Sequence, residues 1–194
     1  MGGPFSFRAC RNRLRPVLPL ATTRLVLRRF ERTDAEPMLP LIGDFAIADG
    51  TARIPHPYTL ADAHAFLDML EKHPDKPIAA ITLNGAVIGA VGLDLEQAHD
   101  KGELGYWVGR PFWGQGYATE AARGMIVIGF KHLNLNKITA HHYTRNPASG
   151  RVLEKAGLVR EGLLRQHMRK WGRFEDCVAY GLTRDQFEVT ASRP

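Results

Sequence analysis

The segment spanning residues 102–121 constrains the fold of this chain more than any other stretch. An apolar strand-like run at 104–108 leads into a loop that holds Gly114 and Gly116, and an alanine-rich helical pattern follows at once. The first N–H groups of a helix have no intrahelical partner, and the helix dipole is positive there. Glycines leave no Cβ between these amides and an anion. We therefore predict that residues 114–118 bind a phosphorylated ligand.

The common nucleotide-binding patterns do not describe this loop. The third position of a Gly-x-Gly-x-x-Gly fingerprint is Thr119, and no Gly-Lys-Ser/Thr follows that could contact β- and γ-phosphates. A glycine-containing turn without a ligand is the alternative interpretation of an isolated Gly-x-Gly.

Two separated motifs resemble one enzyme family. Residues 113–121 (WGQGYATEA) are similar to the pyrophosphate loop of the GNAT N-acetyltransferases, and residues 146–158 (NPASGRVLEKAGL) are similar to their second signature. Together with residues 23–29 and 172–182, they most closely resemble the Rim-type branch, the ribosomal-protein alanine acetyltransferases. The resemblance extends over nearly the whole chain. It implies an α/β fold in which helices flank a mixed, strongly twisted central sheet, and in which splayed parallel strands form an acyl-CoA cleft.

The resemblance also implies how the co-substrate, acetyl-CoA, is held. Loop amides would bind its pyrophosphate, and strands 103–108 and 137–143 would splay around its pantetheine arm. The residues assigned to cofactor binding in this way are Trp107, Val108, Gly114, Gln115, Gly116, Tyr117, Ala118, Thr119, Asn146 and Arg151.

Two positions depart from the family pattern. Trp113 stands where the loop usually begins with Gln or Arg, although backbone amides should still bind the anion. Leu153 stands where many members have a tyrosine that protonates the departing thiolate, and leucine has no proton to donate. Ser149 matches the serine that the resemblance implies as the donor in its place; a small first-turn helix residue is the alternative.

Acetyl transfer to an amine requires that the amine lose a proton and that the thiolate leave. No nucleophilic residue is needed when the amine attacks directly. Glu103 is the leading candidate for the base, because it precedes the loop on the strand that leads into it; a surface glutamate is the alternative. Glu120 lies in the first helical turn and is expected to interact with the helix dipole. Tyr143 is a second candidate for the acid.

Composition limits the class of protein. At 194 residues, with 44% apolar and 24% charged residues, the chain has the size and balance of one globular domain. No run of 18 apolar residues predicts a membrane span. Cys10 and Cys177 have no partnered spacing, which favours a reducing, cytoplasmic location. The histidines lack zinc-ligand spacing with these cysteines, so we expect no metal.

The net charge of +6 is unevenly distributed. Residues 1–29 contain seven arginines and no acidic residue, whereas the rest of the chain is close to neutral. We interpret residues 1–18 as a basic, flexible tail and residues 19–194 as a single N-acetyltransferase domain. Contact of the tail with RNA or the ribosome is the alternative to a solvated segment.

Periodicity and turn signals predict the remaining elements. We expect a strand at 24–30, a helix from the Thr33–Glu36 capping pattern to about residue 42, and a loop at 44–59. A helix at 60–72 precedes a hairpin with Asn84-Gly85 at its turn. After the Gly-loop helix come a strand at 137–143, a helix from Asn146 to Gly157, and two closing strands around Trp171-Gly172, where Arg169, Trp171 and Arg173 contact either substrate or a second copy of the chain.

These features predict an acetyl-CoA-dependent N-acetyltransferase. Its acceptor is a primary amine, either a protein N-terminus or a small molecule, which attacks directly in a ternary complex. An open groove would suit a protein acceptor, and a closed, acid-lined pocket built from residues 44–59 would suit a small amine. The contrasting hypothesis is a non-catalytic acyl-CoA-binding module whose basic tail contacts RNA or the ribosome.

Overall fold

The computed structural model describes residues 17–191. Its centre is an eight-stranded mixed sheet with the order β1-β2-β3-β4-β5-β6-β8-β7. The strands are β1 (Leu20–Ala21), β2 (Leu25–Arg28), β3 (Ile78–Leu83), β4 (Ala86–Glu96), β5 (Lys101–Val108), β6 (Lys137–Tyr143), β7 (Val159–Lys170) and β8 (Arg173–Thr183). Among these pairs β5 and β6 run parallel, and the others are antiparallel.

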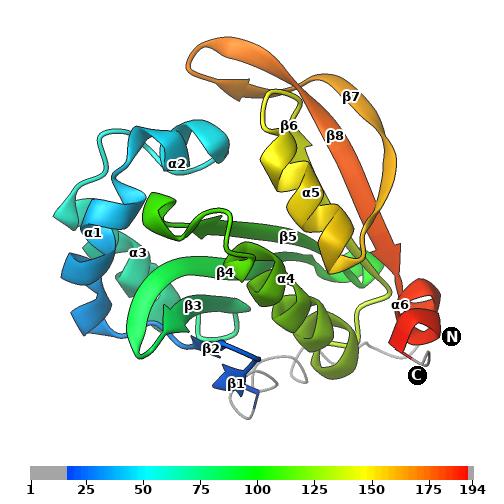
Figure 1. The fold of residues 1–194 in the computed structure, drawn as a ribbon, viewed down its shortest axis with the longest axis horizontal. Coiled ribbons are helices and arrows are strands. Elements are labelled where there is room, and N and C mark those ends of the chain that lie inside the picture. Colours follow the sequence, from blue (N-terminus) through cyan, green and yellow to red (C-terminus); the bar gives the residue numbers. More distant parts are fainter. Residues whose placement is uncertain (1–16, 192–194) are drawn as a thin grey trace, which may run out of the picture.

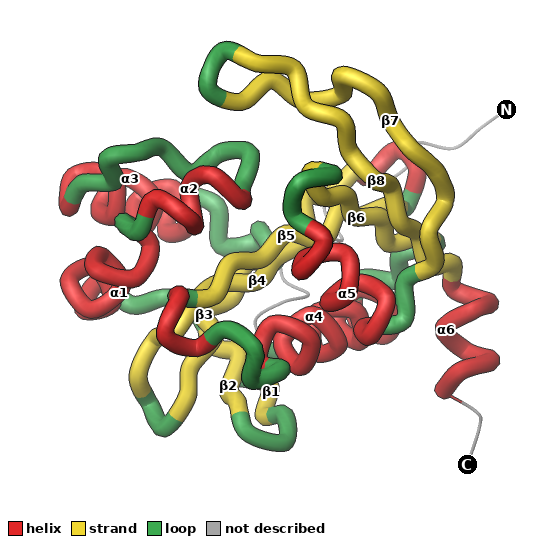
Figure 2. The backbone as a smooth tube through the Cα atoms, turned by 45° about the horizontal axis from the view of Figure 1, so that its top comes forward, coloured by secondary structure: helices red, strands yellow, loops and turns green. Residues whose placement is uncertain are grey.

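Helices cover both faces of the sheet (Figures 1 and 2). They are α1 (Ala35–Ile42), α2 (Phe45–Gly50), α3 (Leu60–Lys72), α4 (Tyr117–Val127), α5 (Pro147–Ala156) and α6 (Arg184–Ala191). The larger core includes α4, α5 and the strands beneath them, whereas α1 and α3 pack with Ala80 and Val87 in a smaller core. The mixed α/β sheet with flanking helices confirms the predicted fold class.

Several predicted elements are confirmed at the residue level. Helix α3 spans the predicted range, with Ala63 and Leu67 of its apolar stripe buried. Asn84 and Gly85 both have positive φ in the β3–β4 hairpin, as a type I′ turn requires. Asn146 caps α5, and Gly157 ends it in the left-handed conformation.

The sequence interpretation was wrong at three places. Residues 44–59 are not all loop, because Asp44 caps the six-residue helix α2. The start of α1 does not use Thr33 as its cap; the Asp34 carboxylate accepts a hydrogen bond from the Glu31 N–H across 2.8 Å and pairs with Arg28. Helix α6 follows β8, and the sequence analysis did not predict it.

The N-terminal boundary of the packed domain also differs from the expectation. Val17 and Leu18, which were assigned to the basic tail, are buried in the larger core. The remainder of the predicted tail, residues 1–16, lies outside the described residues, and so does its predicted contact with RNA or the ribosome.

Candidate active site

The parallel strands β5 and β6 separate after only three residue pairs. Their ladder ends at Glu103–Thr139, and Figure 1 shows β5 turning away from β6 beyond this point. The splayed strands that the sequence analysis expected are therefore present. Separation leaves the backbone groups on one side of β5 without a strand partner, which is how a sheet can offer hydrogen bonds to an extended ligand.

The register decides which backbone groups face this gap. In an antiparallel ladder, opposed residues alternate between hydrogen-bonded and non-bonded pairs. The Gly109 N–H donates to the Ile88 carbonyl across 2.8 Å, so Trp107 forms the next bonded pair with Ala90 on β4. The backbone groups of Trp107 are thus directed toward β4, and those of Val108 toward the gap. Trp107 contributes its side chain to the wall of the site.

The glycine loop and the start of α4 present several unpaired backbone N–H groups side by side. Gly114 and Gly116 have φ values of +74° and +83°, a region that glycine adopts without strain. The first bond within the helix joins the Glu120 N–H to the Gly116 carbonyl, so the N–H groups of residues 117–119 have no intrahelical partner. A Cβ at Gly114 would meet no atom within 4 Å, which leaves this side of the loop open. These groups fit the pyrophosphate of acetyl-CoA.

Side chains fix the conformation of this loop. The Trp113 indole nitrogen donates to the Val108 carbonyl across 2.5 Å, and the Gln115 amide donates to the Pro111 carbonyl across 3.1 Å. Trp113, the departure from the family pattern, therefore ties the loop to the end of β5.

Arg24 supports the loop from the neighbouring β2 segment. Its guanidinium donates to the Gln115 carbonyl across 2.9 Å and lies 4.5 Å from the centre of the Tyr117 ring. Glu120 holds Arg24 in place through a 2.8 Å ion pair. Burial would raise the pKa of Glu120, but hydrogen bonds from Thr22 and Arg24 outweigh it and hold the pKa below its ordinary value.

Ser149 lies in the first turn of α5. The Asn146 side chain accepts a hydrogen bond from the Ser149 N–H across 3.3 Å, which caps the helix. The hydroxyls of Ser149 and Tyr106 are 2.8 Å apart, so β5 and α5 meet at this pair. Burial raises the pKa of Tyr106 to about 12, which keeps its phenol protonated at physiological pH. Arg151 lies exposed on α5, and Leu153 is fully buried.

One cavity of about 1280 Å³ joins the two faces of the sheet. Tyr106, His142 and Ser149 line it on the side of α5, and Glu103, Trp107 and His141 line it on the side of α1 and α3. A cavity that passes through the strand gap allows a ligand on one face to meet a second ligand on the other. The structure thus brings Glu103 and Ser149, the two predicted catalytic residues, to one space.

Glu103 contacts a histidine across the parallel ladder. Its carboxylate lies 3.0 Å from Nδ1 of His141. His141 follows Thr139, the last residue of β6 that pairs with β5, by two positions. The His141 side chain is 20% exposed and that of Glu103 is 44% exposed, so both remain accessible to a ligand in the cavity.

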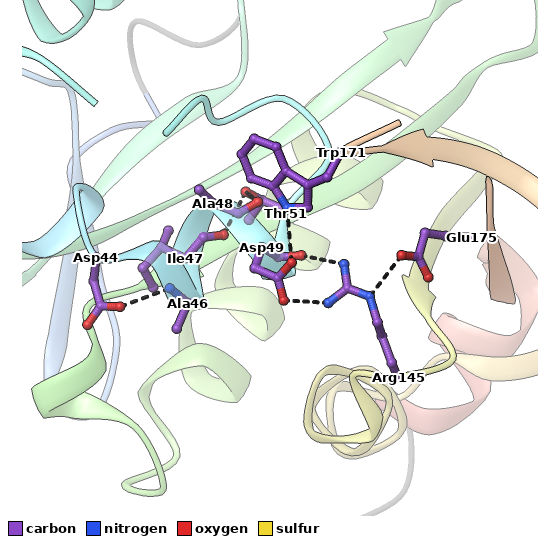
Figure 3. A network of polar contacts seen from close by, with 9 residues as sticks. All are labelled: Asp44, Ala46, Ile47, Ala48, Asp49, Thr51, Arg145, Trp171 and Glu175. Atoms are coloured by element: carbon purple, nitrogen blue, oxygen red, sulfur yellow. Dashed lines mark hydrogen bonds and ion pairs between the residues drawn. The ribbon is translucent and has the colours of Figure 1, made fainter. Parts of the chain in front are cut away.

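A network of contacts, called the roof here, joins α2 to the β7–β8 hairpin beside the cavity wall formed by residues 50–55 (Figure 3). The Trp171 indole stacks on Phe45 with ring centres 5.9 Å apart and donates to the Asp49 carboxylate across 3.0 Å. Arg145 donates to the same carboxylate across 2.5 Å and to Glu175 across 3.2 Å. Trp171, at the predicted contact turn, therefore contacts α2 of its own chain.

A buried lysine extends this roof toward the cavity wall. Lys170 donates from Nζ to the Ile54 carbonyl across 3.0 Å, and burial lowers its pKa. Because residues 50–55 line the cavity, this contact helps to fix one of its walls.

Four residues of the site were not predicted: Arg24, Asp49, Tyr106 as a partner of Ser149, and His141. Each acts through a contact with a residue distant in sequence, so no local pattern marks it. Asp44 directly before Phe45 could have predicted the start of α2, the helix that contains Asp49, because aspartate is a preferred N-cap residue.

Across residues 17–191, no cluster of three or more His, Cys, Asp or Glu side chains is arranged to hold a metal ion. Within the same residues, every helix is too short or too polar to cross a bilayer.

Comparison with known proteins identifies the family. Residues 24–159 match the family described as Acetyltransferase (GNAT) domain. The chain is 30% identical over 174 residues to the "Uncharacterized N-acetyltransferase p20" of Bacillus licheniformis, covering 87% of this chain and 97% of that protein. It is 32% identical over 111 residues to the "Putative ribosomal N-acetyltransferase YdaF" of Bacillus subtilis, covering 57% and 61%.

A solved structure shares the fold. Spermidine N-acetyltransferase from Vibrio cholerae, in complex with CoA and spermine, superposes with a TM-score of 0.74 at 22% identity, covering 86% of this chain and 99% of that one. The glycine loop, the strand gap and the matched family agree on acetyl-CoA as the co-substrate. The chain belongs to the GNAT acetyltransferases and is an N-acetyltransferase that transfers acetyl from acetyl-CoA to an amine.

Proposed function

We propose that this N-acetyltransferase acts on a small, positively charged primary amine, and that the amine attacks acetyl-CoA directly in a ternary complex. The observation that carries the proposal is the cavity that passes through the strand gap beneath the α2–hairpin roof. The acceptor enters on the side of α1 and α3, and the thioester approaches from the side of α4 and α5.

The charge of the cavity lining favours a cationic acceptor. Two cationic side chains, Arg53 and Lys76, line it. The carboxylates among the lining residues are Asp62, Asp75, Asp94, Asp100 and Glu103. An excess of negative charge attracts an ammonium group and raises its local concentration.

The roof favours a small acceptor over a protein N-terminus. Asp49 bridges Arg145 and Trp171, and the stacked Phe45 and Trp171 rings cover the same junction. A peptide must extend out of the site beyond its first residues and needs an open groove, which the joined α2 and hairpin restrict on this side, whereas a compact amine needs no such groove.

Relatives exist for both acceptor classes. The Vibrio cholerae structure is a spermidine N-acetyltransferase, whereas the name of YdaF refers to the ribosome, in line with the Rim-type resemblance. The acid-lined, roofed cavity is the reason that we place this chain nearer the first class.

In the proposed complex, residues of the glycine loop hold the pyrophosphate and the Val108 N–H faces the pantetheine arm. Asn146 orients the start of α5. Proton removal from the amine is assigned to the Glu103 side of the cavity, and Ser149 donates a proton toward the sulfur as the C–S bond breaks. These two proton transfers take place on opposite sides of the strand gap.

The test is an acceptor panel monitored by release of free CoA thiol. Diamines, polyamines and amino alcohols are compared with short peptides that have free N-terminal alanine or serine. We expect kcat/KM for the best diamine or polyamine to exceed that for the best peptide by at least about tenfold, which corresponds to about 1.4 kcal/mol. A preference for peptides would overturn the small-amine assignment in favour of a protein N-terminus.

A further inference from the structure

Glu103 and His141 meet at the point where the sheet opens. Glu103 pairs with Thr139 in the last β5–β6 pair. His141 follows Thr139 by two residues on β6, so the two side chains point to the same face of the sheet. The carboxylate oxygen and Nδ1 are 3.0 Å apart, and both side chains line the cavity. The first residue beyond the ladder on the acceptor face is therefore an imidazole held by a carboxylate.

The contact determines which ring nitrogen is available. A carboxylate accepts hydrogen bonds, so Nδ1 carries the proton that faces Glu103. Nε2 of the neutral ring then retains its lone pair and can accept a proton. Imidazole is the side chain whose ordinary titration lies nearest physiological pH, which suits a general base.

Building on the function proposed above, we infer that His141 is the base that deprotonates the acceptor amine, and that Glu103 is a positioning residue that fixes the ring. This assignment replaces Glu103 as the proton acceptor. Nε2 of His141 takes one proton from the substrate ammonium and later releases it to solvent. The neutral amine nitrogen then forms the N–C bond as the C–S bond breaks. The nitrogen loses its second proton to solvent, and the thiolate receives one from Ser149, whose hydroxyl regains a proton from solvent.

The surroundings of His141 restrict the ring without competing for the proton. His167 on β7 packs edge-on against it, with ring centres 5.6 Å apart and planes at 90°. Ala179 is its uncharged partner on β8, and the buried Cys177 on that strand has its pKa raised, chiefly by burial. Asp94 on β4 stands across from Glu103 and pairs with Arg53 across 2.6 Å.

Three variants separate the base from its support. His141→Asn keeps a donor that can face Glu103 but removes the proton-accepting nitrogen, Glu103→Gln keeps the imidazole, and His167→Gln is the matched control. With the acceptor that wild type turns over best, whether amine or peptide, we expect kcat of His141→Asn to fall at least about 100-fold, a loss typical for a general base. We expect kcat to fall about tenfold in Glu103→Gln and less than about threefold in His167→Gln.

The pH–rate profile gives the second readout. We expect wild type and Glu103→Gln to keep an acidic limb, and His141→Asn to lose it, while all three bind acetyl-CoA with affinities within about twofold. The proposal would be overturned if kcat fell further in Glu103→Gln than in His141→Asn and if Glu103→Gln also lost the acidic limb of its pH–rate profile. Glu103 would then be the base.

A third readout does not depend on activity. Ring-nitrogen NMR of the wild-type protein, assigned by comparison with His141→Asn, should show the tautomer protonated at Nδ1. The tautomer protonated at Nε2 would contradict the assignment whatever the acceptor is. Because the kinetic test uses the best acceptor found, a peptide preference would overturn the small-amine proposal and leave this one standing.

Discussion

The indole nitrogen of Trp113 donates a hydrogen bond to the carbonyl of Val108 across 2.5 Å. The bond joins the last residue of β5 to the glycine loop, to which we assign the pyrophosphate. It occupies the carbonyl of Val108 and leaves the N–H of the same residue directed at the strand gap. A residue that departs from the family pattern thus joins the two backbone segments to which we assign acetyl-CoA binding.

Trp113→Phe should therefore weaken acetyl-CoA binding. The change removes one hydrogen bond, which is worth about 1 kcal/mol, and we expect an affinity loss of about fivefold in calorimetric titration. Trp171→Phe is the control, because Trp171 is similarly exposed, at 46% against 49%, and lies in the roof. Equal losses in the two variants would assign the effect to general loss of packing.

Gly114→Val should block the approach of the pyrophosphate. Gly114 and Gly85 both have positive φ and open space where a Cβ would stand, so valine strains the backbone to a similar extent at either position. Only Gly114 lies in the loop, and we expect its variant to bind acetyl-CoA at least about tenfold more weakly than Gly85→Val. Equal affinities, measured by titration of both folded variants, would refute the placement of the pyrophosphate.

Tyr106→Phe should affect catalysis only through Ser149. With its pKa raised to about 12, the phenol is neutral throughout the assay range and orients the serine hydroxyl. We expect Ser149→Ala to lower kcat by about 100-fold and Tyr106→Phe by about tenfold, with the double variant no slower than Ser149→Ala. Additive losses in this cycle would show that the two hydroxyls act independently.

Glu120→Gln should destabilise the protein in a pH-dependent way. The pKa of Glu120 is lowered in the folded state, so its carboxylate stabilises the fold above the unfolded-state pKa and loses this contribution as pH falls through the folded-state pKa. We expect the variant to lose about 1–2 kcal/mol at pH 7, through weaker hydrogen bonds with Thr22 and Arg24, and the difference to shrink in acid. Urea unfolding at pH 7 and below pH 4 measures both values. A constant difference would contradict this account.

Asp49→Ala should loosen the roof over the acceptor. It removes the carboxylate that accepts one hydrogen bond from the Arg145 guanidinium and one from the Trp171 indole. We expect KM for the small amine to rise about tenfold with kcat within about threefold, because the roof confines substrate without touching the reacting atoms. Asp68→Ala is the control, since Asp68 pairs with Arg32 on the outer surface. Unchanged KM would remove the roof from acceptor binding.

The glycine loop was predictable because its chemistry is local. Strand, loop and helix start follow one another in sequence, and the positive φ of Gly114 and Gly116 needs only their own lack of a Cβ. The Asn84-Gly85 hairpin and the Asn146 cap were predicted for the same reason.

The acceptor side was less accessible to sequence reasoning. Helix α2 has six residues, too few for a helical pattern of apolar residues to be recognised, and the roof depends on Trp171, more than a hundred residues away. His141 and His142 are adjacent on β6, so their side chains point to opposite faces of the sheet. Their surroundings differ because Glu103 lies beside His141 only, and that proximity follows from where the β5–β6 ladder ends.

The three residue pairs between β5 and β6 also form the shortest ladder among strands β2–β8. The strands β1–β5 and β6–β8 are joined through this ladder, through the contact of α4 with α5 and through the α2–hairpin roof. A ligand that inserts into the gap supplies hydrogen bonds that the separated strands lack, and so it bridges the two halves. Binding of acetyl-CoA and folding are then linked by mass action, so we expect the loaded enzyme to unfold at a higher temperature than the free chain.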